Sequence, residues 1–281
     1  METIGNPWLY LAFFAIVAVM LLIDFMGFKQ KEGQEVKLKT AAYWSIAWVT
    51  VASFFGGGLW LYLQQTAGIT IANAKTMEYF AGYLLEKSLA IDNVFVWLMI
   101  FAAFAIPQGL QRKILLYGVL GAIVLRTIFI FIGAWFVQEF SWILYIFGAF
   151  LLYTGFKFLK GQDEENTNIE DMAILKWLRK HMRITPKLEG AKFFVRQNGV
   201  LWATPLFLVL ILVEASDVIF AVDSIPAIFA VTSDPFIVLT ANLMAILGLR
   251  AMFFLLSGAA SKMHYLPYGL GIILMFIGTK M

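Results

Sequence analysis

Long apolar stretches alternate with short polar ones along the whole chain. A helix that crosses a bilayer needs about 20 mainly apolar residues. Eight stretches approach or exceed that length: 7–28, 41–64, 77–105, 112–136, 141–160, 200–231, 234–257 and 264–281. The pattern predicts an all-α, polytopic membrane bundle in contact with the lipid bilayer.

The composition narrows the chemistry. Of the 281 residues, 61% are hydrophobic and 14% are charged. A soluble domain of this size does not need so large a share of hydrophobic residues. There is no Cys, so disulfides and thiolate metal sites are excluded. No GxxxxGK[ST] pattern for ATP and no YD or GxGD protease motif occurs. We therefore expect a protein that is not an enzyme and that has no nucleic-acid partner.

Basic residues are gathered in alternate loops. They are Lys29, Lys31, Lys37 and Lys39, then Arg112 and Lys113, nine residues between 157 and 196, and Lys262. The other loops contribute only Lys75 among basic residues. Because basic loops stay in the cytoplasm, the N-terminus is expected outside. The N-terminal "METIGNPW" has no basic residue and so lacks the n-region of a signal peptide, which predicts that the first span is retained rather than cleaved. The loop 161–199 contains "IEDMAILKWLRKHM", which predicts either a helix on the cytoplasmic membrane surface or a soluble connecting helix.

The sixth stretch carries three acids in an apolar setting, Glu214, Asp217 and Asp223 in "LILVEASDVIFAVDSIPAIFAV". An Asp at the centre of a membrane helix costs about 2.5–3.5 kcal/mol, so these acids need protons, basic side chains or a metal cation. Glu214 and Asp217 share a helical face, and Asp223 lies half a turn away from Glu214. All three can face one site only if the helix breaks at Pro226; the alternative is a simple proline kink with Asp223 capped by Ser224.

The third stretch is polar in the same way. It contains "LLEKSLAIDNVF", in which Glu86 and Asn93 share one face and Ser88 and Asp92 another. Lys87 lies between them. Asp24 in the first stretch is either an accessory to this site or an acid at the membrane interface. Asn242 in the seventh stretch either forms an interhelical hydrogen bond or serves as an accessory ligand.

Two parts of the chain resemble each other. "DNVFVW" at 92–97 matches "DVIFAV" at 217–222, and the surroundings of Arg126 match those of Arg250. Each repeat, 77–160 and 200–281, has three spans, and an odd number inserts successive repeats in opposite orientations. The expected order is two N-terminal helices (1–64), repeat 1, the cytoplasmic loop 161–199 and repeat 2. In inverted-repeat proteins the site lies near the midplane, here between the third and sixth spans.

The buried charge points to a cation. Five acids against three bases leave −2, which one divalent cation or two protons would neutralise. The acids are Glu86, Asp92, Glu214, Asp217 and Asp223, and the bases are Lys87, Arg126 and Arg250, which we interpret as structural counter-ions. Oxygen ligands suit hard ions such as Mg²⁺, Ca²⁺ or Mn²⁺ and do not choose among them.

The stretches "EKSLAIDNVFVW" and "VEASDVIFAVDSIPAIFAVTSDPFIVLTANLMAILGLRAMFFLL" resemble the TerC family of bacterial integral membrane proteins. The resemblance implies an inner-membrane protein of manganese homeostasis that exports Mn²⁺. It also implies a further C-terminal helix beyond residue 281. Calcium or proton-coupled transport, and a scaffold that helps to metallate secreted enzymes, stay open as alternatives. The positions that match the family's acidic motifs are the candidate metal ligands Glu86, Asp92, Asn93, Glu214, Asp217, Asp223 and Ser224.

Overall fold

The computed structural model describes residues 3–27, 37–140, 142–159 and 173–257, together with residues 272, 275, 276 and 279. The first part is a series of helices, α1 (Pro7–Gly27), α2 (Leu38–Thr66), α3 (Ile69–Ala103), α4 (Gln108–Glu139) and α5 (Ile143–Leu159). These correspond to the first five predicted spans. The predicted last span, 264–281, lies outside the described residues apart from those four.

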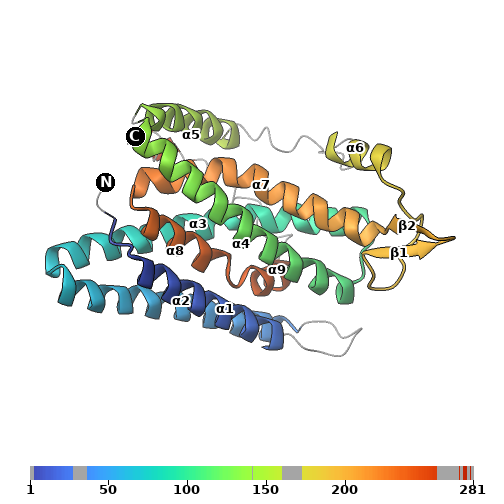
Figure 1. Ribbon diagram of the computed structural model, residues 1–281, viewed down its shortest axis with the longest axis horizontal. Coiled ribbons are helices and arrows are strands. Elements are labelled where there is room, and N and C mark those ends of the chain that lie inside the picture. Colours follow the sequence, from blue (N-terminus) through green and yellow to red (C-terminus); the bar gives the residue numbers. More distant parts are fainter. Residues whose placement is uncertain are drawn as a thin grey trace.

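The second part begins with a short helix and a hairpin at one end of the bundle and then returns to the bundle (Figure 1). Its elements are α6 (Ala173–His181), β1 (Phe194–Gln197), β2 (Val200–Ala203), α7 (Pro205–Val231), α8 (Pro235–Ile246) and α9 (Leu249–Ser257). The all-α membrane bundle is confirmed, but the predicted start of the sixth span at 200 is wrong. Residues 200–203 pair with β1 in an antiparallel hairpin, because Asn198 and Gly199 both adopt positive φ and form its turn.

The helices surround α8, in which every residue is buried. α3 and α4 pack against α8, and α7 packs in turn against α3 and α4. α1 and α2 cover one side, and α6 and the hairpin lie at the end opposite the N-terminus (Figure 1). Of the described helices, α1, α2, α4 and α7 are long and apolar enough to cross a membrane, and α8 with α9 form a further candidate. Large apolar side chains such as Trp8, Tyr43 and Phe54 are exposed on the outer helices, where lipid would cover them.

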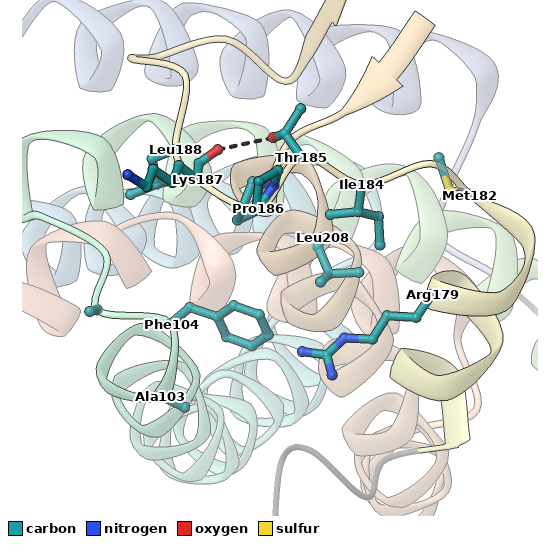
Figure 2. A pocket seen from close by; sticks show the side chains of 12 residues that line it. Ala103, Phe104, Arg179, Met182, Ile184, Thr185, Pro186, Lys187, Leu188 and Leu208 are labelled. Carbon is teal, nitrogen blue, oxygen red and sulfur yellow. Dashed lines mark hydrogen bonds between the residues drawn. The ribbon is translucent and has the colours of Figure 1, made fainter.

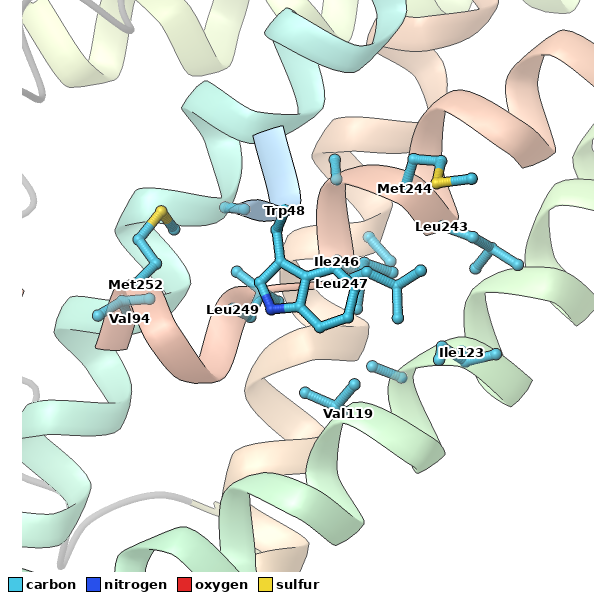
Figure 3. Close-up of a cluster of buried hydrophobic side chains, with 14 of the residues drawn as sticks. Trp48, Val94, Val119, Ile123, Leu243, Met244, Ile246, Leu247, Leu249 and Met252 are labelled. Atoms are coloured by element: carbon cyan, nitrogen blue, oxygen red, sulfur yellow. The ribbon is translucent and has the colours of Figure 1, made fainter. Parts of the chain in front are cut away.

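The helix break is not where the sequence predicted it. α7 continues from Pro205 to Val231 with Pro226 inside it, so the expected unwound "DSIP" segment is absent. The break lies instead between α8 and α9, which meet at 41°. Gly248 at this point has φ +89°, and a Cβ there would come within 2.7 Å of Trp48. Figure 3 shows the Trp48 side chain lying against Leu247 and Leu249.

α3 and α7 run in opposite directions through the centre of the bundle. Gly82 of α3 faces Ile228 of α7, while Asn93, three turns further along α3, reaches back to Asp217. This antiparallel arrangement places the polar segments of the two helices at the same depth. The inverted repeats stay a prediction, since the third span of the second repeat lies outside the described residues.

Candidate functional site

Arg126 is the centre of a buried polar cluster. Its Nε and Nη2 atoms donate to the two carboxylate oxygens of Asp217, over 3.1 and 2.8 Å. Its Nη1 atom forms an ion pair with Glu86 and lies 3.4 Å from the amide oxygen of Asn242. A guanidinium presents several N–H groups in one plane, which suits such multiple contacts. One side chain of α4 therefore contacts α3, α7 and α8.

Asn93 completes this group, which we call the Arg126 cluster: Glu86, Asn93, Arg126, Asp217 and Asn242. The Asn93 Nδ2 atom donates to Asp217 Oδ1 over 3.1 Å. No member of the cluster is more than 1% exposed. Glu86 and Asn93 share a face of α3 as predicted, because seven residues make nearly two full helical turns.

The cluster has more acceptors than donors. With all groups ionised, two carboxylates and one guanidinium leave a net charge of −1. Among the described residues, Glu86 Oε2 and Asn93 Oδ1 have no hydrogen-bond partner, against one unpaired donor, Asn242 Nδ2. Each buried unpaired polar group costs about 1–3 kcal/mol. The arrangement is therefore suited to a further positive or hydrogen-bond-donating partner: a proton, a cation or an ordered water.

Glu214 lies one helical turn before Asp217 on the same face of α7. Its carboxylate rests on the backbone of α4 at Gly121, where any Cβ would overlap it. Its Oε2 atom has no partner among the described residues. Gly121 was not singled out from the sequence, although the spacing of Gly118 and Gly121 in "GVLGAIVLR" indicates close helix contact.

Other predicted site residues lie elsewhere. Asp92 and Asp223 are half-buried, and each is about a third of a turn around its helix from Glu86 or Asp217. Ser224 is buried, and Ser88 donates to the carbonyl of Leu84 in its own helix. Among the described residues no group of three or more His, Asp or Glu side chains is close enough to hold a metal.

The second buried arginine has a different partner. Arg250 of α9 donates from Nη1 to Asp24 Oδ2 of α1 over 2.7 Å, and both side chains are about 5% exposed. Asp24 is thus buried in an ion pair with Arg250, apart from the Arg126 cluster, and its depth in the membrane stays a prediction. Lys87 donates to the carbonyl of Ala245 over 3.1 Å, in the last turn of α8, where a cation complements the helix dipole.

A second polar network closes the bundle at the end that carries the N-terminus. Asp234 caps α8 by accepting from Phe236 N, and it also accepts from Thr3 Oγ1 and Ile4 N. Nearby, Glu78 of α3 accepts from both Lys75 and Thr232. These contacts hold the ends of α3, α7 and α8 together. Asp234, the first residue of the predicted seventh span, was not singled out from the sequence.

Comparison with known proteins supports the resemblance. The model of the integral membrane protein TerC family matches residues 71–281. A protein of Escherichia coli strain K12, "Putative membrane-bound redox modulator Alx", is 57% identical over 281 residues, which cover 100% of this chain and 87% of that protein. Its namesake in Photorhabdus laumondii is also 57% identical, with coverage of 100% and 88%.

A more distant relative shows the same extent of similarity. "Uncharacterized membrane protein STKORF319" of Myxococcus xanthus is 45% identical over 284 residues, covering 100% of this chain and 86% of that protein. No solved structure matches. The family match covers most of the chain, and the relatives cover all of it. The chain is thus a multi-pass membrane protein that belongs to the integral membrane protein TerC family.

Proposed function

We propose that this protein exports a divalent metal cation, Mn²⁺, from the cytoplasm across the bacterial inner membrane by alternating access, with its N-terminus outside. The Arg126 cluster is the observation that carries the proposal. It places two carboxylates and two amides from three helices around one guanidinium, deep in the bundle. Ionisable residues in such a position mark ion pathways in membrane proteins.

The charge around the Arg126 cluster supports a cation as cargo. The cluster itself holds the carboxylates of Glu86 and Asp217 against one guanidinium. Glu214 lies one turn away from Asp217 on α7, and with Glu214 ionised the local balance is −2. One divalent cation would neutralise this charge, and protons on the same acids could exchange against the metal.

The available ligands are oxygens. Glu86 and Asp217 would supply carboxylates and Asn93 an amide oxygen, with Glu214 one turn away. Hard cations such as Mn²⁺, Mg²⁺ and Ca²⁺ prefer this set, and the chain has no Cys for softer metals. The resemblance to the TerC family favours Mn²⁺ within this group, while Ca²⁺ is the alternative cargo.

Arg126 has a defined part in this scheme. In this structure its guanidinium lies between Glu86 and Asp217 and compensates both carboxylates. An entering cation takes over these carboxylates, and Arg126 returns to them when the cation leaves. The two carboxylates therefore always have a positive partner. An uncompensated buried carboxylate would cost several kcal/mol of desolvation free energy.

The name shared by the relatives in Escherichia coli and Photorhabdus laumondii refers to redox modulation. This chain has no Cys, so its own side chains cannot carry out thiol–disulfide exchange. On our proposal, an effect on cellular redox balance would come from the transported metal. A scaffold that only assists metallation of secreted enzymes would not need a polar cluster shared by α3, α4, α7 and α8.

Uptake of radioactive Mn²⁺ into inside-out membrane vesicles tests the proposal. Loss of one charge-assisted contact is worth about 1.5–3 kcal/mol, so Glu86→Gln and Asp217→Asn should each lower uptake about tenfold or more. Glu139→Gln is the matched control, because Glu139 is an exposed acid at the end of α4. If both cluster variants accumulate Mn²⁺ like wild type, the assignment is wrong; competition by Ca²⁺ and Mg²⁺ identifies the preferred cargo.

A further inference from the structure

An open cleft of about 720 Å³ lies at the end of the bundle opposite the N-terminus. It is bounded by the end of α3, the segment that follows α6 and the start of α7 (Figure 2). Its walls are mainly apolar, including Phe104, Ile184 and Leu208. Two basic side chains, Arg179 and Lys187, also line it, and no acidic side chain does among the described residues.

The wall of the cleft is held by backbone hydrogen bonds. Ala203 of β2 donates to the carbonyl of Arg183 and accepts from the N–H of Thr185, over 2.8 and 2.9 Å. The buried Thr185 hydroxyl donates to the carbonyl of Lys187 over 2.9 Å, the bond drawn in Figure 2. Since β2 leads directly into α7, the segment that carries Lys187 is fixed to the start of that helix.

The surroundings have the character of a membrane surface. α6 buries Leu175 and Leu178, exposes Trp177 to 58% and ends with basic residues. The hairpin exposes Phe194 and Leu201. Residues 173–204 contain seven Lys or Arg and one acid, a balance of +6. Exposed apolar side chains next to basic ones favour contact with anionic lipid headgroups.

We propose that this cleft is a binding site for one anionic phospholipid. The phosphate lies between Arg179 and Lys187, and an acyl chain covers Phe104 and Leu208. Figure 2 shows the Arg179 side chain reaching across the cleft toward these two apolar residues. A zwitterionic lipid has less to gain from a cleft that two cations and no acid line among the described residues. Free phosphate gains nothing from the apolar walls. The bound lipid connects the end of α3 to the start of α7.

Native mass spectrometry of the purified full-length chain in detergent, titrated with phosphatidylglycerol or phosphatidylcholine, tests this site. The decisive variant is Arg179→Gln/Lys187→Gln. The matched control is Lys180→Gln/Arg196→Gln, which removes one Lys and one Arg from exposed positions of α6 and β1 outside the cleft. Each basic side chain near lipid headgroups contributes about 1 kcal/mol to binding. Because the cleft variant loses two of them, it should bind phosphatidylglycerol about 30-fold more weakly.

We expect wild type and the control variant to retain one phosphatidylglycerol molecule at concentrations where phosphatidylcholine is not retained. Ala103→Phe, which fills the apolar part without changing charge, should also lose the lipid. Equal retention of the two lipids, or unchanged retention by the cleft variant, would overturn the proposal. Displacement of the lipid by millimolar inorganic phosphate would make this a site for a soluble anion instead.

Discussion

Replacement of Arg126 by Met is the most direct test of the buried cluster. Met has a similar length but no charge, so Arg126→Met leaves the carboxylates of Glu86 and Asp217 buried without their cation. Wild-type Arg126 donates to both oxygens of Asp217, over 2.8 and 3.1 Å, with both side chains almost fully buried. The variant therefore removes a bidentate contact that solvent cannot replace.

The expected loss is large. Removing one partner of a buried ion pair costs about 3–5 kcal/mol, mainly because the other charge is left uncompensated. For a chain of this size each kcal/mol shifts the unfolding temperature by about 2–4 °C, so Arg126→Met should unfold about 10 °C lower than wild type in EDTA. Adding Asp217→Asn should recover part of this loss, because the second change removes an uncompensated charge.

Manganese provides the decisive comparison. A ligand present at 100 times its dissociation constant stabilises the folded state by about 2.7 kcal/mol. Arg126→Met should gain more from Mn²⁺ than wild type does, since the guanidinium no longer competes for the carboxylates. Arg250→Met is the matched control, because it leaves a single buried acid, Asp24, at a different place. The unfolding temperature of each variant in detergent is measured with EDTA and with Mn²⁺. An equal rise of the unfolding temperature on addition of Mn²⁺ in the two variants would refute a cation site at the Arg126 cluster.

Three further substitutions test other parts of the structure. Gly121→Ala places a methyl group on the Glu214 carboxylate, so we expect Mn²⁺ uptake to fall several-fold; unchanged uptake would show that the contact between α4 and Glu214 is dispensable. Gly248→Ala forces a side chain into a left-handed conformation, at about 1–2 kcal/mol, and against Trp48, so the unfolding temperature should fall by about 5 °C or more. Asp234→Ala removes the N-cap of α8 at about 1 kcal/mol and releases the N-terminal segment, which limited proteolysis should detect as faster cleavage. Wild-type cleavage rates would contradict the role given to Asp234.

Much of the fold could be predicted from the apolar pattern, because membrane spans are long and strongly apolar. The residues at which the spans begin and end were harder to predict. α3 begins at Ile69 and not at 77, since Lys75 and Glu78 are paired with each other inside the helix. Val200–Ala203 was interpreted as the start of a helix because it is apolar. The preceding Asn198 and Gly199 are typical of a hairpin turn and were the signal that would have shown it.

The site could be predicted in part. Helical periodicity placed Glu86 with Asn93 and Glu214 with Asp217, and the structure brings Glu86, Asn93 and Asp217 together around Arg126. Pairing between helices was not predictable, because it depends on the rotation and depth of each helix in the bundle. The two similar repeats would suggest similar partners for their arginines. The structure instead gives Arg126 two acids of the repeats and pairs Arg250 with Asp24 of α1.

Pro226 is a second place where packing decided the structure against the sequence pattern. A proline inside a helix lacks the N–H that would bond the carbonyl four residues earlier, which is why its position suggested a break. α7 is nevertheless continuous, with Pro226 and its neighbours Ser224–Phe229 all buried, so packing holds the helix in place. Pro226→Ala returns the missing hydrogen bond but removes buried ring carbons, so we expect the two effects on stability to offset to within about 1 kcal/mol.

The same substitution separates two mechanisms. If Asp217 needs only a continuous α7 to face Arg126, Mn²⁺ uptake by Pro226→Ala should stay within about twofold of wild type. If transport requires α7 to unwind at Pro226, uptake should fall while the unfolding temperature is retained. Pro205→Ala is the control, because Pro205 occupies the first position of α7, where no helical N–H bond is lost. Since α7 is unbroken around Asp217, we expect the first outcome. A selective loss of uptake in Pro226→Ala would instead favour a mechanism in which α7 unwinds at Pro226.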